Sequence, residues 1–284
     1  MLKANRVLQI TGTAAALLGI MAIAESRKDY RFTVGPKATI SVVNDYGPIS
    51  VRPSTGSQVI VTATLHSDKV EVDNDQSGNR VQIHSHLLAG ATQDTGKVDY
   101  ELLVPPDASV TLHSSTGPLR AERLNGDVSL EGAAADVDVH DISDAHVHVN
   151  TVSGVVKVGN VRNGHVEITS VSGPITLIDV SGPKVQVSST SGKISYAGDF
   201  GGGGEYQLVS HTGDIEATVP EGASFDVTAR SVHGSVDNGD LQLQPKNHTF
   251  FSQVPGSAFA GTMGKAASSV VLRTFSGKIH LKKR

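Results

Sequence analysis

Three stretches in the middle of the chain repeat one pattern: Val149-Asn-Thr-Val-Ser-Gly-Val-Val-Lys-Val158, Ile168-Thr-Ser-Val-Ser-Gly-Pro-Ile-Thr-Leu177 and Val187-Ser-Ser-Thr-Ser-Gly-Lys-Ile-Ser-Tyr196. Each stretch places a glycine between two runs in which apolar and polar residues alternate, and the glycines are 19 residues apart. Alternation with a period of two is typical of a β-strand with one buried face. The pattern therefore predicts short strands joined by a tight turn.

The same pattern continues on both sides of these stretches. Equivalent glycines follow at Gly213, Gly234 and Gly277, and a shorter run such as His165-Val-Glu-Ile168 occupies the other half of each repeat. Two strands of about four residues cannot bury an apolar face alone, but repeats stacked about 4.8 Å apart can. The sequence therefore predicts an all-β fold, a single-stranded β-solenoid or β-helix with two-strand coils of about 19 residues. A β-sandwich is the alternative, although Greek-key connections rarely give so constant a spacing.

Hydroxyl side chains precede the turn glycines, since Ser153, Ser172, Ser191 and Thr212 recur at the same place in the repeat. In stacked coils they would form a ladder along one edge. We expect the glycine after each of them to adopt a positive φ, which glycine reaches without strain. Because the serines recur in every coil, we interpret them as structural hydroxyls and not as nucleophiles.

The remaining chain divides around these coils. We expect one β-strand repeat domain over residues 30–284, with a β cap at its start, regular coils at about 108–237, an insertion at 238–268 and a final coil at 269–284. The cap is predicted because its alternating runs have irregular lengths and are separated by turn residues.

The insertion holds Phe250, Phe251, Phe259 and Met263. We expect it to cover an open part of the core as a flap, or else to form the wall of a binding pocket. The basic end of the chain, Lys278 and Lys282-Lys-Arg284, is expected to guard the last edge strand against pairing with another molecule. The alternative is contact with an anionic lipid or polymer.

Residues 1–24 have the features of an export segment. Lys3 and Arg6 precede an uncharged, largely apolar stretch over residues 7–24, which ends Ala22-Ile23-Ala24. A basic start, an apolar stretch and small residues at the cleavage positions are typical of a signal peptide. The alternative is a retained membrane anchor, because the stretch is just long enough to span a bilayer. In either case we expect the rest of the chain to be exported, to the periplasm or the cell surface.

The composition excludes several classes of protein. The 284 residues include no cysteine, which excludes disulfide scaffolds, cysteine zinc sites and thiol nucleophiles. The formal net charge is −4 and aromatic residues make up 4% of the chain, so we expect no nucleic-acid partner.

The chain resembles the bacterial β-strand repeat family known as domain of unknown function 4097, or "putative adhesin". The matching segments are Gly47-Pro-Ile-Ser-Val51, Val98-Asp-Tyr-Glu-Leu-Leu-Val-Pro105, the Ser-Gly-x-Ile/Val repeats and the end of the chain from Gly261 to Leu281. The resemblance covers about residues 30–284. It implies an exported β-solenoid of the cell envelope, and it carries no catalytic residue that could be transferred to this chain.

Histidines converge in two neighbouring repeats. In the 19-residue register His146 aligns with His165, and His148 aligns with Glu167. These four side chains would share one outward patch, with Asp127 next to it. Imidazole and carboxylate groups together suit zinc, copper or nickel, so these residues are candidate metal ligands. The alternative is a solvated face with a His148–Glu167 pair. His84 and His86 form a second pair for which no third ligand is apparent.

Large β-helices often cleave polysaccharides, which requires two carboxylates in a walled groove. Asp136 and Asp138 share a face, but the register places Lys157 beside Asp138 and predicts its neutralisation. We therefore expect an exported, non-enzymatic envelope protein without a cofactor, either an adhesin or a scaffold. Its expected partner is a polymer or protein of the cell surface or envelope, and residues 7–24 are a candidate membrane tether. A carbohydrate-active enzyme and a periplasmic metal-binding protein are the alternatives.

Overall fold

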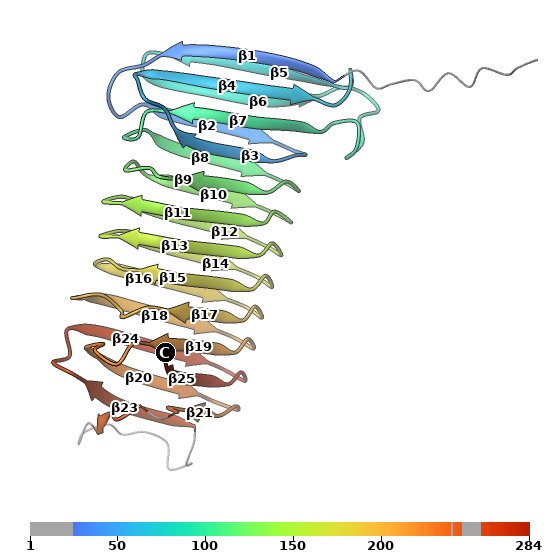
Figure 1. The fold of residues 1–284 in the computed structure, drawn as a ribbon. Helices are drawn as coiled ribbons and strands as arrows, with labels where there is room; N and C mark the ends of the chain where they lie inside the picture. The colour runs from blue at the N-terminus through green and yellow to red at the C-terminus, as the bar shows by residue number, and fades with distance from the viewer. Residues whose placement is uncertain (1–24, 240, 246–256) are drawn as a thin grey trace, which may run out of the picture.

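The computed structural model describes residues 25–239, 241–245 and 257–284, and these residues form two long β-sheets that face each other (Figure 1). In the order in which they pair, the twelve strands of sheet A are β1 (Ser26–Thr33), β4 (Gln58–Leu65), β7 (Val98–Val104), β3 (Ile49–Pro53), β9 (Leu119–Glu122), β11 (Val137–Ser143), β13 (Val156–Arg162), β15 (Ile175–Val180), β17 (Ile194–Ala197), β19 (Ile215–Val219), β25 (Ile279–Lys283) and β21 (Val236–Asp237). The thirteen strands of sheet B are β22 (Gln244–Pro245), β23 (Ala258–Met263), β20 (Phe225–Ser231), β24 (Ser268–Thr274), β18 (Gly204–Ser210), β16 (Lys184–Ser189), β14 (His165–Ser170), β12 (His146–Thr151), β10 (Val128–Gly132), β8 (Ser109–Ser114), β2 (Thr39–Asn44), β6 (Arg80–Leu87) and β5 (Val70–Ser77).

The regular coils stack in parallel and in the register that the repeat predicts. Val147 of β12 pairs with Val166 of β14, which pairs with Val185 of β16, and all three side chains are buried between the sheets. On sheet A, Val156 pairs in the same way with Ile175. Alternate residues of each strand therefore fill one continuous core, and the predicted all-β solenoid of two-strand coils is confirmed.

The C-terminal coil does not lie at the end of the solenoid. β24 lies between β18 and β20, and β25 lies between β19 and β21, so the last coil of the chain is inserted between two coils made earlier. The C-terminus accordingly lies beside β19 and not at the tip of the molecule (Figure 1).

The prediction that the basic tail guards the last edge strand is therefore wrong. β21 pairs with the start of β25, and the basic side chains instead contact carboxylates of earlier coils. Lys282 pairs with Glu216, and Lys283 lies 2.7 Å from a carboxylate oxygen of Glu221. The reason is that every coil has a similar turn, so the repeat pattern does not reveal the order in which coils stack.

The N-terminal end is built on the same principle. The first coil, β2 and β3, lies between the coil of β8 and β9 and a later segment, β6 and β7. Three antiparallel strands then extend the two sheets, β4 and β1 on sheet A and β5 on sheet B. The two edge strands carry charged side chains, which disfavour edge-to-edge pairing: Arg27, Lys28 and Arg31 on β1 and Glu71, Asp73 and Asp75 on β5.

The turn glycines are required for close contact between coils. A Cβ atom on Gly173 would lie 1.8 Å from the carbonyl oxygen of Gly154, and one on Gly192 would lie 2.0 Å from that of Gly173. These glycines are not among the residues with positive φ, so the prediction of a left-handed conformation there is wrong. Positive φ angles occur instead at Asp141, Asn160 and Asp179, near the ends of β11, β13 and β15, and at Asp144 and Asn163 in the opposite turn. Short polar side chains tolerate this conformation.

Aromatic residues fill the core where the coils widen. The ring of Phe200 stacks on Tyr196 with centroids 4.3 Å apart and meets Tyr206 and Phe225 edge to face. The chain leaves Phe200 through Gly201, which has a positive φ, and the four-glycine segment forms a wide turn. The extra residues of this turn account for the change from 19 to 21 residues between coils.

Part of the insertion covers the C-terminal end of the core. Leu241 is buried, and Leu243, Phe259 and Met263 pack against the core cluster. β23 pairs antiparallel with β20 and carries β22 on its outer side. Phe250 and Phe251 lie outside the described residues, as does the whole of the export segment.

Candidate functional site

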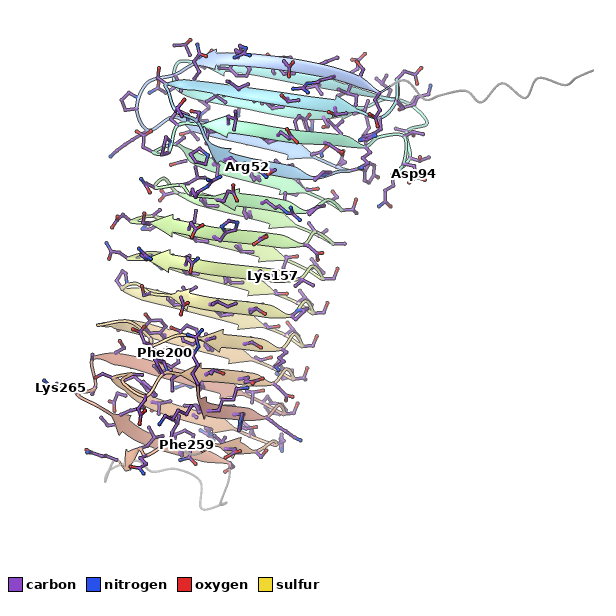
Figure 2. All side chains as sticks on the ribbon, in the orientation of Figure 1. Arg52, Asp94, Lys157, Phe200, Phe259 and Lys265 are labelled. Carbon is purple, nitrogen blue, oxygen red and sulfur yellow. The ribbon has the colours of Figure 1, made fainter. Side chains whose placement is uncertain are left out.

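The outward face of sheet B gathers half of the twelve histidines of the sequence. They alternate with buried residues on strands that lie near one another in the sheet: His84 and His86 on β6, His113 on β8, His146 and His148 on β12, and His165 on β14. Figure 2 shows the rows of side chains that project from the coils. The strand period of two, which buries the valines, therefore turns these histidines toward solvent.

The four candidate metal ligands lie next to one another as the register predicts. His146 is directly opposite His165, and their rings are 5.1 Å apart between centroids with an interplanar angle of 71°. His148 is opposite Glu167, with 3.7 Å between its Nδ1 and a carboxylate oxygen. Asp127 accepts a hydrogen bond of 2.9 Å from the backbone N–H of His146.

In the part of the chain that the structure describes, no three histidine, aspartate or glutamate side chains converge closely enough to hold a metal ion. His84 and His86 lie opposite Asp73 and Glu71, and no histidine faces them from the neighbouring strands. Metal binding on this face stays a prediction, and the two rings in direct contact there are those of His146 and His165.

The carboxylates considered for glycan cleavage have structural partners. Asp136 accepts a hydrogen bond of 2.8 Å from the backbone N–H of Val155. Asp138 lies between Arg120 and Lys157, which are directly opposite it on the two neighbouring strands (Lys157 is labelled in Figure 2). Lys157 therefore lies in the register position that the sequence predicts, and Asp136 is engaged by a backbone N–H.

Two hydroxyl columns follow the turns, and the sequence revealed only one of them. The exposed hydroxyls donate to carbonyls of the preceding coil, Ser172 to Val152 and Ser191 to Val171, each at 3.2 Å. A second, buried column accepts from the turn glycines, as in the bond of 2.8 Å from the Gly192 N–H to Ser189 Oγ. The signal for it is a serine or threonine three residues before each turn glycine.

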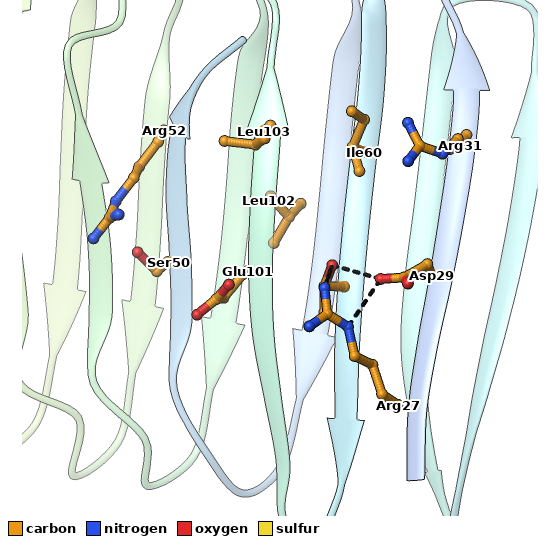
Figure 3. A pocket seen from close by; sticks show the side chains of 10 residues that line it. Arg27, Asp29, Arg31, Ser50, Arg52, Ile60, Glu101, Leu102 and Leu103 are labelled. Atoms are coloured by element: carbon orange, nitrogen blue, oxygen red, sulfur yellow. Dashed lines mark hydrogen bonds and ion pairs between the residues drawn. The ribbon is translucent and has the colours of Figure 1, made fainter.

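A hollow of about 330 Å³ lies on sheet A at the N-terminal end (Figure 3). Arg31, Ile60, Leu103 and Arg52 form one row across β1, β4, β7 and β3, and Leu103 is 41% exposed. Arg52 is held by Glu122 at 3.3 Å. Sequence analysis missed this hollow because its strands are not consecutive.

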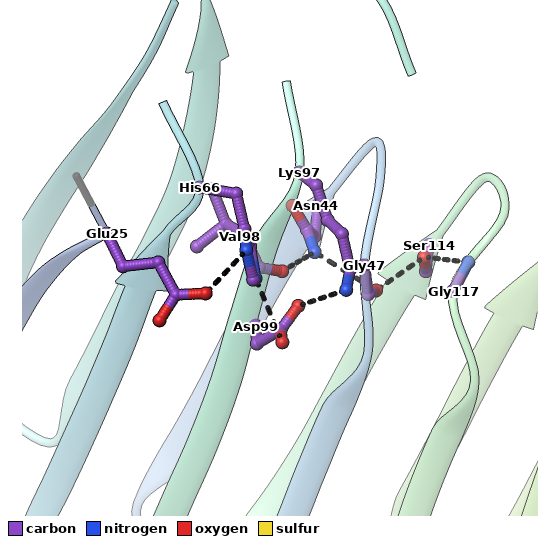
Figure 4. A network of polar contacts seen from close by, with 9 residues as sticks. All are labelled: Glu25, Asn44, Gly47, His66, Lys97, Val98, Asp99, Ser114 and Gly117. Carbon is purple, nitrogen blue, oxygen red and sulfur yellow. Dashed lines mark hydrogen bonds and ion pairs between the residues drawn. The ribbon is translucent and has the colours of Figure 1, made fainter. Parts of the chain in front are cut away.

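A charged network joins the first described residue to the cap (Figure 4). His66 lies between two carboxylates, with Nδ1 3.3 Å from Glu25 and Nε2 3.0 Å from Asp99, and Lys97 is 3.4 Å from the other oxygen of Asp99. His66 Nε2 has no partner with hydrogen-bond geometry among the described residues. The network fixes the point where the chain enters β1.

The resolved pKa shifts have structural causes. Burial raises the pKa of Tyr100 and of Tyr196 well above the usual range. Hydrogen bonds from Lys193 and Lys282 lower the pKa of Glu216 to about 2. A hydrogen bond from Thr62 contributes most to the lowered pKa of Asp29. None of these shifts belongs to a pair of groups arranged as a general acid and base.

A family model described as Toastrack DUF4097 matches residues 38–282 of the chain. The chain belongs to this family. The match spans the regular coils, the insertion and nearly all of the last coil. The resemblance noted in the sequence is thereby confirmed. No curated protein matches the chain.

Solved structures that align with most of this chain are described as bacterial adhesion proteins. A "putative adhesin" from Bacteroides fragilis is 12% identical and aligns over 90% of this chain and 97% of its own, with a TM-score of 0.49. A "putative cell adhesion protein" from Clostridium sporogenes is 12% identical over 91% of this chain and 100% of its own, with a TM-score of 0.31. Because neither TM-score reaches 0.5, membership of the Toastrack family rests on the family model.

Proposed function

We propose that this Toastrack protein is an exported, non-enzymatic adhesin or envelope scaffold that holds an extended polymer or protein along the outward face of sheet B. The observation that carries the proposal is an unbroken row of polar side chains on successive strands. Its members lie directly opposite one another: Ser41, Thr111, Ser129, His148, Glu167, Gln186 and Gln207.

This row offers similar contacts at regular intervals. Its six steps of about 4.8 Å cover roughly 29 Å of the solenoid axis. A partner with its own repeat can engage several positions at once, and linked weak contacts add up to a useful affinity. Hydroxyl and amide groups both donate and accept hydrogen bonds, and a carboxylate accepts them, so the row is suited to hydroxyl-rich or amide-rich partners.

Sedimentation with isolated bacterial envelope fractions tests the binding face. A chain of residues 25–284 is expected to co-sediment, and the triple variant Ser129→Ala, Gln186→Ala, Gln207→Ala should bind at least tenfold more weakly. The matched control is Thr176→Ala, Ser195→Ala, Thr218→Ala on sheet A, whose residues also point outward. Failure of the wild-type chain to sediment, or equal loss in both variants, contradicts the proposal.

Export is tested separately, by protease treatment of intact and lysed cells that produce the full chain. Cleavage in intact cells places the domain at the surface and supports adhesion. Protection that ends when the outer envelope is opened places it in the periplasm and favours a scaffold. Protection that ends only when the cytoplasmic membrane is broken contradicts export. The described residues contain no helix that is long and apolar enough to span a membrane.

A further inference from the structure

We propose that His146 and His165 form a chelate site for a first-row transition-metal ion, with zinc as the representative probe. The two side chains project from neighbouring parallel strands, at directly opposite positions on the outward face of sheet B. Backbone pairing on both sides fixes the two Cα atoms, so the pair is held together before any ion arrives.

The spacing of the rings fits a shared ion. Zinc binds imidazole nitrogen at about 2.0–2.1 Å, so two imidazoles on one tetrahedral ion have ring centres roughly 5 Å apart. The centroids of His146 and His165 are 5.1 Å apart and their planes are inclined by 71°. Coordination would direct one nitrogen of each ring at a common point by rotation about the side-chain bonds, while strand pairing holds the two backbones in place.

The surroundings favour a cation on one side of the pair. Asp127 lies beside His146 and accepts its backbone N–H, while His148 and Glu167 occupy the next outward positions of the same two strands. Lys184 is opposite His165 on the other side and opposes a cation there. Water would complete the coordination, because the described residues offer no third converging ligand. The affinity should therefore be lower than that of four-ligand structural zinc sites.

A second histidine pair on the same face provides the matched control. His84 and His86 have the same two-residue spacing as His146 and His148, but they face Asp73 and Glu71 and have no histidine across the strand. If the cross-strand pair creates the site, this pair should contribute little to the tightest binding.

The test is zinc titration by calorimetry on the chain of residues 25–284, with thermal unfolding as a second readout. The wild-type chain should bind one equivalent of zinc most tightly and melt at a higher temperature in its presence. His146→Ala and His165→Ala should each weaken that binding at least tenfold and abolish the rise in melting temperature. The variant His84→Ala, His86→Ala should bind as the wild type does.

Three outcomes would overturn the proposal: no zinc binding by the wild-type chain, unchanged binding in the His146→Ala, His165→Ala double variant, or equal loss in the His84, His86 control. Melting without metal shows whether each variant is folded. All four histidines lie on the outward face, so we expect unchanged melting temperatures in that condition.

Discussion

In the middle of the solenoid, from β10 to β17, each coil rests on the coil that precedes it in the chain, whereas at the C-terminal end the last coil lies between two earlier ones. A turn glycine in the middle contacts one 19 residues away, as Gly173 contacts Gly154, while Gly277 contacts Gly213 across 64 positions. Local contacts form faster than distant ones because less chain entropy is lost in closing the loop. The two regions therefore share one coil geometry, but the stacking order of the coils depends on local contacts in the middle and on contacts between distant segments at the C-terminal end.

Removing the last coil should have the largest effect on stability, and this effect should differ between the two regions. A chain that stops after Ala267 lacks β24 and β25, which pair with β18 and β20 and with β19 and β21. Amide hydrogen exchange in β18–β21 should accelerate about a thousandfold, because an opening free energy of about 4 kcal/mol is lost. Exchange in β10–β17 should change little. Equal loss of protection in both regions would show that the solenoid unfolds as one unit.

The aromatic cluster lies at the boundary between the two regions. Phe200→Ala removes a fully buried ring that contacts Tyr196, Tyr206 and Phe225, and should lower the free energy of unfolding by about 3–5 kcal/mol. Phe275→Ala is the control, because this ring is 43% exposed, and it should cost less than about 1 kcal/mol. Urea unfolding of both variants makes the comparison. Equal losses would contradict the packing described for Phe200.

Adding one methyl group to a turn glycine tests how closely the coils are held. Gly173→Ala should cost about 3 kcal/mol, since its Cβ would lie 1.8 Å from a carbonyl oxygen between two fixed coils. Gly234→Ala, on the outermost coil, should cost roughly half as much because that coil can shift outward. Gly222→Ala has nothing within 4 Å of the new Cβ and should change stability by less than about 0.5 kcal/mol. A reversed order in urea unfolding would refute this account of the turns.

The ion pairs of the inserted coil should give the smallest effect, and it depends on pH. Lys193 and Lys282 lower the pKa of Glu216 to about 2, below its ordinary value of 4.5. A lowered carboxyl pKa stabilises the folded state at pH values above the ordinary pKa. This contribution disappears as the pH falls from about 4.5 to about 2. Because the two lysines are half-exposed, we expect only about 1 kcal/mol. Glu216→Gln should remove this difference between neutral and acidic pH in thermal melts, and an unchanged pH profile would contradict it.

The regular coils could be predicted from the sequence because period-two alternation and constant spacing follow directly from strand geometry. Val147, Val166 and Val185 are buried in one column as expected, and His146 lies opposite His165 for the same reason. The position of the last coil could not be predicted, since its turn, Thr274 to Gly277, has the same form as the others. Stacking order depends on contacts between distant segments, such as Lys282 with Glu216.

The polar contacts also divide into those that the sequence predicts and those that it does not. The His148–Glu167 pair is a contact between consecutive coils, and register alone places it. The hollow beside Arg31 and Arg52 and the network around His66 are formed by strands of the cap that are neighbours in space but not consecutive in the chain. Neither follows a repeat, so no spacing in the sequence indicates them. The role of the turn glycines was misassigned because a close approach between coils and a positive φ both require glycine.

The inserted last coil also makes completion of the chain a condition for closing the fold. During synthesis, β18 to β21 are made before the strands that must lie between them. An unfinished chain therefore presents unpaired strand edges on both sheets, which favour aggregation and attack by proteases. Once they are made, β24 and β25 pair with these edges on both sheets. The topology thus makes a chain that contains β24 and β25 physically different from one that ends before them.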